Sequence, residues 1–166
     1  SCAVMTGGAA LCWGDNYFGQ LGDGTTSDRP TPIPVGGLPG GVSSITAGQM
    51  HTCAVTTGGD VTCWGGNWTG QLGDGTTAIR PTATPVTSLA SGVASIAVGR
   101  TVCATTSGGA AMCWGANRYG QLGDGTTTIR LVPTPVSGLG SGVEAIATGS
   151  QHVCAVTTGG AALCWG

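Results

Sequence analysis

The chain has 166 residues, of which 7% are charged, and its seven acidic residues and five arginines give a net charge of −2. Five scattered arginines cannot form the basic stripe typical of nucleic-acid binding, so we expect no nucleic-acid partner. Gly, Thr, Ser or Pro interrupts every apolar run before 18 residues, so we also expect no membrane insertion. Short apolar runs between such residues are typical of strands and turns, and predict an all-β protein.

The sequence repeats with a period of about 50 residues. Each period contains an 11-residue unit with a cysteine at each end, followed by Trp-Gly, and these units begin at Cys2, Cys53, Cys103 and Cys154. The first three units continue into Asn-x-x-Gly-Gln-Leu-Gly-Asp-Gly-Thr-Thr. We expect one propeller segment over 1–166, with repeats at approximately 1–40 (partial), 41–91, 92–141 and 142–166 (partial).

The second repeat shows the strand pattern. Alternation between turn residues predicts strands at about 42–47, 52–57, 60–64 and 82–87. Four short strands in about 50 residues are the pattern of a propeller blade rather than of a helical solenoid. The sequence therefore predicts a β-propeller made of four-stranded blades, here an incomplete set of three-plus blades.

The paired cysteines predict disulfides within hairpins. A three-residue loop centred on Gly58 would place Cys53 opposite Cys63, with Cα atoms about 4.5–5.5 Å apart, a separation that a disulfide accepts. Metal binding and free buried thiols are the alternatives, but a nine-residue gap is not a zinc knuckle. Disulfides persist in oxidising compartments, so we expect an extracellular, cell-surface or periplasmic protein. The expected bridges are Cys2–Cys12, Cys53–Cys63, Cys103–Cys113 and Cys154–Cys164.

The polar residues that recur in the repeat favour structural roles. The Asp of each Gly-Asp-Gly-Thr-Thr loop suggests calcium, but one carboxylate per loop is too few ligands, and we expect it to contact the Arg six residues later. We expect the Trp-Gly tryptophans to pack in the core, and the glutamines to satisfy backbone groups of the loop that follows them. For His51 and His152 we favour a structural hydrogen bond over a role as ligand or base.

The loop after each Trp-Gly keeps its Asn but varies on either side of it. The variable positions hold the residues most enriched at binding hot spots. The alternative is that these side chains cover the neighbouring blade. Asn67-Trp68-Thr69 is formally a glycosylation sequon, but an Asn stands there in every full repeat, which favours a turn role. The candidate binding residues are Tyr17, Phe18, Trp68, Arg118 and Tyr119.

The repeat resembles that of the regulator-of-chromosome-condensation family, which reads Gly-x-x-His-x-x-Ala-Leu, Gly-x-Val and then Trp-Gly-x-Asn-x-x-Gly-Gln-Leu-Gly. The third repeat departs from this pattern, because it is one residue shorter before Thr101 and lacks the His. The resemblance implies a seven-bladed propeller of roughly 350 residues. It also implies binding through loops, as in the secreted β-lactamase inhibitory proteins of this family; a nuclear role on chromatin is disfavoured by the acidic, cysteine-paired chain. The second repeat carries the match at Gly48, His51, Ala54, Gly59, Val61, Trp64, Gly65, Asn67, Gly70, Gln71, Leu72 and Gly73.

No catalytic motif accompanies these repeats, so we expect no enzyme activity, no cofactor and no metal. The expected function is an extracellular binding module whose propeller loops contact a protein or a glycan. The alternative is a structural or assembly component of a cell-surface layer, appendage or adhesin. Because the pattern starts inside a hairpin at Ser1-Cys2 and stops at Trp165-Gly166, we expect further blades of the same polypeptide, or other copies, to close the ring.

Overall fold

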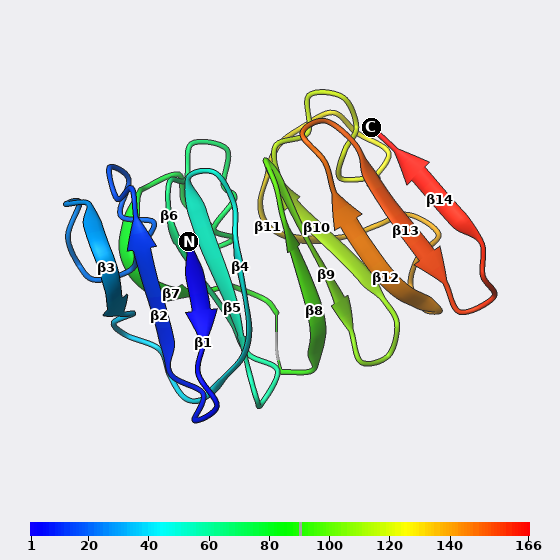
Figure 1. The fold of residues 1–166 in the computed structure, drawn as a ribbon. Helices are drawn as coiled ribbons and strands as arrows, with labels where there is room; N and C mark the ends of the chain where they lie inside the picture. Colours follow the sequence, from blue (N-terminus) through cyan, green and yellow to red (C-terminus); the bar gives the residue numbers. More distant parts are fainter. Residues whose placement is uncertain (90) are drawn as a thin grey trace.

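The computed structural model describes residues 1–89 and 91–166, and these form fourteen strands in four antiparallel sheets (Figure 1). Two sheets have four strands, in the orders β4-β5-β6-β7 and β11-β10-β9-β8, and two have three, β1-β2-β3 and β12-β13-β14. Within this described part no helix is long and apolar enough to cross a membrane. The strands are β1 (Cys2–Val4), β2 (Ala10–Gly14), β3 (Arg29–Pro34), β4 (Val42–Ala47), β5 (His51–Thr56), β6 (Val61–Gly65), β7 (Arg80–Pro85), β8 (Val93–Val98), β9 (Thr101–Thr106), β10 (Ala111–Gly115), β11 (Arg130–Pro135), β12 (Val143–Thr148), β13 (Val153–Thr157) and β14 (Ala162–Trp165).

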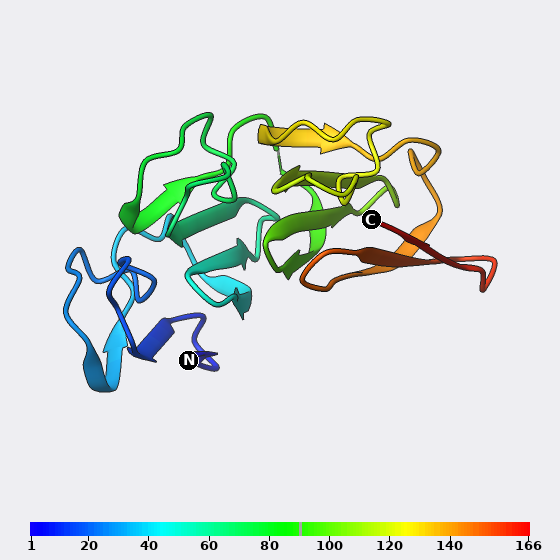
Figure 2. The ribbon, with the colours of Figure 1, turned by 90° about the horizontal axis from the view of Figure 1, so that it is seen from above.

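The four sheets are the blades of an incomplete β-propeller, which confirms the predicted fold class. Seen from above, they stand side by side in an arc (Figure 2). Strands β4, β8 and β12 are the innermost of their sheets and neighbour one another. The pairing of Cys2 with Cys12 matches that of Cys53 with Cys63, so β1–β3 correspond to β5–β7, and the first sheet has no counterpart of β4. Likewise β12–β14 correspond to β4–β6, and the last sheet has no counterpart of β7.

The second blade agrees closely with its predicted strands. Strand β4 has the predicted bounds, β5 and β6 are displaced by one residue, and β7 begins two residues early at Arg80, which pairs with Gly65 beyond a bulge. The three-residue hairpin loop is also confirmed, because Val55 pairs with Val61. Gly59 takes the position with φ of +81°, which a side chain would strain.

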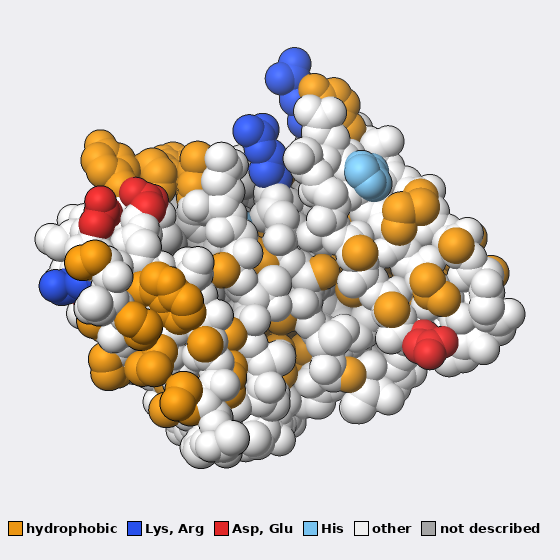
Figure 3. All heavy atoms as spheres, viewed as in Figure 1, with side chains coloured by type: hydrophobic (Ala, Val, Ile, Leu, Met, Phe, Trp, Pro, Cys, Tyr) orange, Lys and Arg blue, Asp and Glu red, His pale blue; other side chains and the backbone are white. Residues whose placement is uncertain are grey.

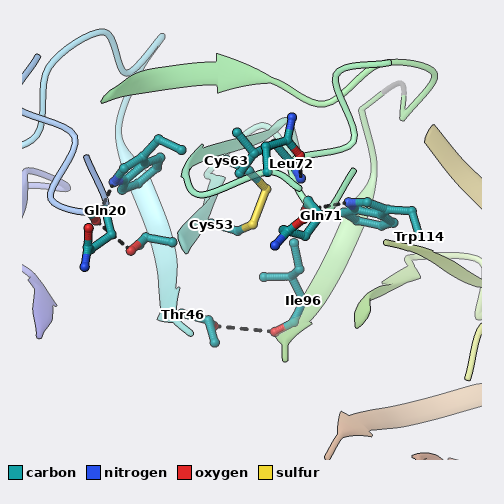
Figure 4. Close-up of a disulfide and its surroundings, with 11 residues drawn as sticks. Gln20, Thr46, Cys53, Cys63, Gln71, Leu72, Ile96 and Trp114 are labelled. Carbon is teal, nitrogen blue, oxygen red and sulfur yellow. Dashed lines mark hydrogen bonds between the residues drawn. A yellow bond between two sulfur atoms is a disulfide. The ribbon is translucent and has the colours of Figure 1, made fainter. Parts of the chain in front are cut away.

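The hydrophobic cores lie between neighbouring blades rather than inside one sheet. Val55 and Cys63 of the second blade pack in one buried cluster with Ile96 and Trp114 of the third. The Cys53–Cys63 disulfide lies within this core, close to Leu72 and Ile96 (Figure 4). Each core is therefore buried only when two neighbouring blades pack against each other.

All four hairpins carry the predicted disulfide. Each bridge joins directly opposed residues whose Cα atoms are 4.1 Å apart, slightly closer than the expected separation, and no free cysteine remains in the described part of the chain. The register that the Gly-Gly loop imposes thus determines the pairing. The bridges are Cys2–Cys12, Cys53–Cys63, Cys103–Cys113 and Cys154–Cys164.

Candidate functional site: the loop face

One side of the propeller carries all the long loops, and we call it the loop face. The long loops follow the third strand of the repeat, at 15–28, 66–79 and 116–129, and the turns 48–50, 99–100 and 149–152 join the innermost strands to the next. The upper edge of Figure 1 is this face. The hairpin turns that close the disulfide units lie on the opposite side.

A buried asparagine organises each long loop. Asn67 is fully buried; its Oδ1 accepts from the Leu72 N–H at 2.9 Å, and its Nδ2 donates to the carbonyls of Thr76 and Ala78, each at 3.0 Å. Asn16 and Asn117 make equivalent bonds. The side chain therefore holds the loop closed, as expected for a turn role, and in the folded chain Asn67 has no exposed amide to carry a glycan.

The Asp–Arg contact predicted for each blade is confirmed. The side chains of the pairs lie at 2.6 Å for Asp23 and Arg29, 2.8 Å for Asp74 and Arg80, and 2.7 Å for Asp124 and Arg130. Burial raises the pKa of Asp23, but hydrogen bonds from Thr25, Arg29 and Asn16 outweigh this effect and lower the pKa to about 2. The pKa values of Asp74 and Asp124 are also lowered, because hydrogen bonds from the neighbouring Thr and Arg outweigh the effect of burial.

These aspartates are therefore committed to structural contacts. In the described part of the chain, no three His, Cys, Asp or Glu side chains gather as metal ligands would.

The glutamines satisfy backbone groups, as predicted, but these groups precede them in the chain. Gln71 Oε1 accepts from the backbone N–H of Thr69 at 2.8 Å, two residues earlier, and Gln20 and Gln121 do the same with Phe18 and Tyr119. The expectation that they serve the loop that follows is wrong, because the side chain folds back across the turn between Asn67 and Gln71. It is the glutamine's backbone carbonyl that reaches the next blade.

That carbonyl accepts from the tryptophan one blade further on. Trp64, Trp114 and Trp165 donate from Nε1 to the carbonyls of Gln20, Gln71 and Gln121 at 3.0, 3.0 and 2.8 Å, and Figure 4 shows the bond between Trp114 and Gln71. Trp64 and Trp114 are fully buried, as expected for core residues, whereas Trp13 and Trp165 of the two end sheets are half-buried. Each long loop is thus fixed at its base to the following blade, while its tip reaches solvent.

Three of the five candidate binding residues form one cluster. The rings of Tyr17 and Phe18 meet edge to face at 4.8 Å, and Phe18 meets Trp68 of the next blade in the same way at 4.6 Å. Tyr17 is 72% exposed and Trp68 47% exposed, whereas Phe18 is half-buried. Phe18 partly covers the neighbouring blade, the alternative role considered above, while Tyr17 and Trp68 offer an open aromatic surface.

The other two candidates form a separate pair on the third blade. The guanidinium of Arg118 lies 5.7 Å from the centre of the Tyr119 ring, a cation–π contact, and Tyr119 is half exposed. The structure therefore divides the five residues into two groups on different blades. The chain has no lysine, so the blue side chains in Figure 3 are arginines. Some of them project from the upper edge of the molecule, where hydrophobic side chains are also exposed.

A hollow of about 500 Å³ opens on the loop face where the inner turns of three blades converge. Its lining includes Met50, Trp68, Gln71, Arg100 and Ser150. The turn of the middle blade, 99–100, is one residue shorter than the corresponding turn 48–50, so it leaves space between its neighbours. The sequence shows the shorter turn but not the hollow, and no repeated pattern marks Met50 or Arg100 as candidate site residues.

His51 borders the hollow, but the prediction of a hydrogen bond for it is wrong. Its side chain is 3% exposed, and its Nε2 has no hydrogen-bond partner among the described residues. Burial lowers the pKa of His51 to about 4, so the imidazole is neutral at pH 7. The corresponding residues differ: His152 is exposed, and Thr101 donates from its hydroxyl to the Ala116 carbonyl at 2.6 Å.

Comparison with family models identifies the repeat. Two models, each described as the regulator of chromosome condensation (RCC1) repeat, match the chain, one at residues 7–55 and 109–156 and the other at 42–71. Among curated proteins, the ultraviolet-B receptor UVR8 of Arabidopsis thaliana is 43% identical over 74 residues. That match covers 44% of this chain and 17% of UVR8.

Solved structures agree with the fold over nearly the whole chain. Human WBSCR16 matches with a TM-score of 0.85 at 25% identity, and yeast RCC1 (Prp20), in a structure with bound Kap60, matches with a TM-score of 0.83 at 22% identity. Each match covers 99% of this chain but only 44% and 41% of the other. This chain therefore spans less than half of the propellers that it resembles.

Proposed function

Because the chain belongs to the regulator of chromosome condensation (RCC1) repeat family, we propose that it is a non-enzymatic binding module whose loop face contacts a protein partner. The observation that supports this most directly is the cluster of Tyr17, Phe18 and Trp68. Its three rings come from two blades and remain accessible on loops whose bases are fixed. Rigidly held aromatic side chains are typical anchors of protein interfaces.

The rest of the chain fits a binding role better than catalysis. All eight cysteines form disulfides, and three of the seven acidic residues are held by arginines within their own loops. Yeast RCC1, which has the same fold, has been crystallised with the protein Kap60. A protein partner is therefore our first choice over a glycan.

We place this binding outside the cytoplasm. Four disulfides in a chain of 166 residues support an oxidising compartment, since the reducing cytosol would open such bonds. The extracellular space, the cell surface and the periplasm all meet this condition.

The alternative is a structural component that assembles with other copies. Its support is apolar surface away from the loop face: Val156 and Leu163 of the last sheet are 41% and 43% exposed. In that case the contacts of the chain would run from blade to blade and would not require the aromatic cluster.

One capture experiment separates the two functions. The immobilised chain is exposed to surface and secreted proteins of its source, alongside a Tyr17→Ser, Trp68→Ser double variant. A matched control is Met5→Ser, since Met5 is 52% exposed in a hairpin turn on the opposite side. Loss of a captured protein in the double variant alone supports the binding module, whereas equal capture by all three chains contradicts it.

A further inference from the structure

The first repeat shows a partner for the side-chain amide of the glutamine that recurs in each full repeat. Gln20 donates from Nε2 to the carboxylate of Asp15, the residue that follows Trp13-Gly14. In the second repeat Gly66 stands in the place of Asp15, so that carboxylate is absent. The structure thus contains one glutamine with its acidic acceptor and two without it: Gln71, and Gln121 of the third repeat, where Ala116 takes the place of Asp15.

The side-chain amide of Gln71 has a donor without a partner among the described residues. Its Oε1 accepts from both the N–H and the hydroxyl of Thr69, at 2.8 and 2.9 Å, and these bonds fix which end of the amide is oxygen. The side chain is 8% exposed, and its Nε2 donates no hydrogen bond to any described residue. The nitrogen is not among the fully buried side-chain atoms that lack a partner, so it is open to solvent and free to donate to a ligand.

Gln71 lines the hollow of about 500 Å³, together with an arginine that has no acidic partner. Three of the five arginines pair with aspartates of their own loops, but Arg100 makes no ion pair within the described residues. The lining contains no Asp or Glu, and the buried His51 beside it is neutral at pH 7. The hollow therefore offers one positive charge and one amide donor, and no described residue neutralises the charge or accepts from the amide.

The remaining wall is apolar. Trp68 and the half-buried Met50 line the hollow, and the Trp68 ring lies over Gly66, where an added Cβ would come within 2.5 Å of the ring. Because residue 66 is glycine, the indole occupies the space that a side chain would fill. A ligand in the hollow would meet polar donors on one side and an aromatic ring on the other.

We propose that this hollow binds a carboxylate of the protein partner, with Gln71 Nε2 and the Arg100 guanidinium as donors. An apolar side chain next to that carboxylate would pack on Trp68 and Met50. Charged acceptors form shorter and stronger hydrogen bonds than neutral ones, and guanidinium matches the two oxygens of a carboxylate. This inference rests on the proposed binding function and names the chemistry of one contact. An Asp or Glu side chain and a chain-terminal carboxylate supply the same group.

Peptide titrations followed by NMR test the proposal directly. The probes are acetyl-Leu-Glu-amide, its neutral counterpart acetyl-Leu-Gln-amide, acetyl-Gly-Leu with a free carboxyl terminus, and glucuronic acid. We expect the carboxylate peptides to bind at least about tenfold more tightly than the neutral peptide, equivalent to about 1.4 kcal/mol. They should shift the side-chain amide signals of Gln71 but not those of Gln121, which lies outside the hollow. Equal affinity of the charged and neutral peptides, or binding of glucuronic acid alone, would overturn the proposal.

Variants at residue 66 supply the matched comparison. Gly66→Asp introduces the carboxylate that Gln20 already has in the first repeat, and Gly66→Ala adds a side chain at the same point without charge, as Ala116 does in the third. We expect Gly66→Asp to abolish binding of the carboxylate peptides and Gly66→Ala to retain more of it. Arg100→Gln, at an exposed site, should weaken binding at least about tenfold without affecting folding. Unchanged affinity in both Gly66→Asp and Arg100→Gln contradicts the proposal.

The two proposals can fail separately. Tyr17→Ser alone separates them, because Tyr17 does not line the hollow. If this variant loses partner capture but no carboxylate peptide binds, the binding module stands and the carboxylate site is wrong. If carboxylate peptides bind as expected but Tyr17→Ser captures proteins as well as the original chain, the carboxylate site stands and Tyr17 is not part of the binding surface.

Discussion

The indole Nε1 of Trp64 donates a 3.0 Å hydrogen bond to the backbone carbonyl of Gln20, 44 residues earlier and one blade away. The same bond recurs between Trp114 and Gln71 and between Trp165 and Gln121. Each tryptophan thus joins the core of its own blade to the loop of the preceding one. The loop face depends on these contacts, although Trp64 and Trp114 are themselves buried beneath it.

Replacing this tryptophan should therefore cost far more than replacing the nearby exposed one. We expect Trp64→Ala to lower the free energy of unfolding by roughly 3–5 kcal/mol, as for other buried aromatic residues, and Trp68→Ala by less than about 1 kcal/mol, as for a surface change. Trp64→Phe should cost about 1 kcal/mol, because the Thr52 hydroxyl still donates to the Gln20 carbonyl. Denaturant unfolding measures all three free energies. Equal losses of stability in Trp64→Ala and Trp68→Ala would contradict the distinction between a core and a surface tryptophan.

The disulfides should stabilise each hairpin by a similar amount. A bridge that closes a loop of about 11 residues contributes roughly 2–3 kcal/mol in the chain-entropy model, so Cys53→Ala with Cys63→Ala should lower the free energy of unfolding by at least that much. Peptide mapping without reduction should recover the four pairs of the structure. Bridges between different blades, or free thiols in protein from an oxidising compartment, would contradict both the pairing and the proposed localisation.

The sequence predicted the repeated features better than the unique ones. The disulfide register and the Asp–Arg pairs follow from short-range spacing, which one repeat is sufficient to define. The hollow could not be predicted in this way, because it forms between turns about 50 and 100 residues apart and depends on where three blades meet. The local signals for it were the shorter turn at Arg100 and the glycine at position 66, both departures from the repeat.

The buried His51 should make the protein less stable in mild acid. Burial lowers its pKa to about 4 from an ordinary value of 6.5, so the unfolded chain binds a proton more readily than the folded chain. Stability is therefore lost as the pH falls from about 6.5 to about 4, by on the order of 3 kcal/mol. We expect His51→Thr, which copies Thr101, to flatten the pH profile of unfolding in this range. His152→Thr is the exposed control, and an identical effect of the two variants would contradict the prediction.

The loop aspartates should affect the stability of the protein at lower pH than His51 does. Hydrogen bonds and the arginine partner outweigh burial and lower the pKa of Asp23 to about 2, so its carboxylate is more stable in the folded chain than in the unfolded one. Its contribution is fully present above about pH 4 and is lost as the pH falls toward 2. Asp23→Asn should reduce the dependence of unfolding on pH between 4 and 2; Asp60→Asn, in an exposed hairpin turn outside the long loops, is the control. An unchanged slope in Asp23→Asn would contradict a role for the ion pair in acid stability.

The exposed flank of the last blade should bind another blade. Val55 is 2% exposed because the third blade covers it, whereas Val156, the corresponding residue of the last sheet, is 41% exposed. Ala162, which pairs with Val156 on the adjacent strand, is exposed as well. Uncovered apolar surface of this kind favours association, and in the repeat the group that covers it is the next blade. We therefore expect the 16.1 kDa chain on its own to self-associate in light scattering, and Val156→Glu to shift it toward the monomer mass. Met5→Glu, in an exposed hairpin turn, is the control. A stable monomer of the unaltered chain at high concentration would show that this flank needs no partner.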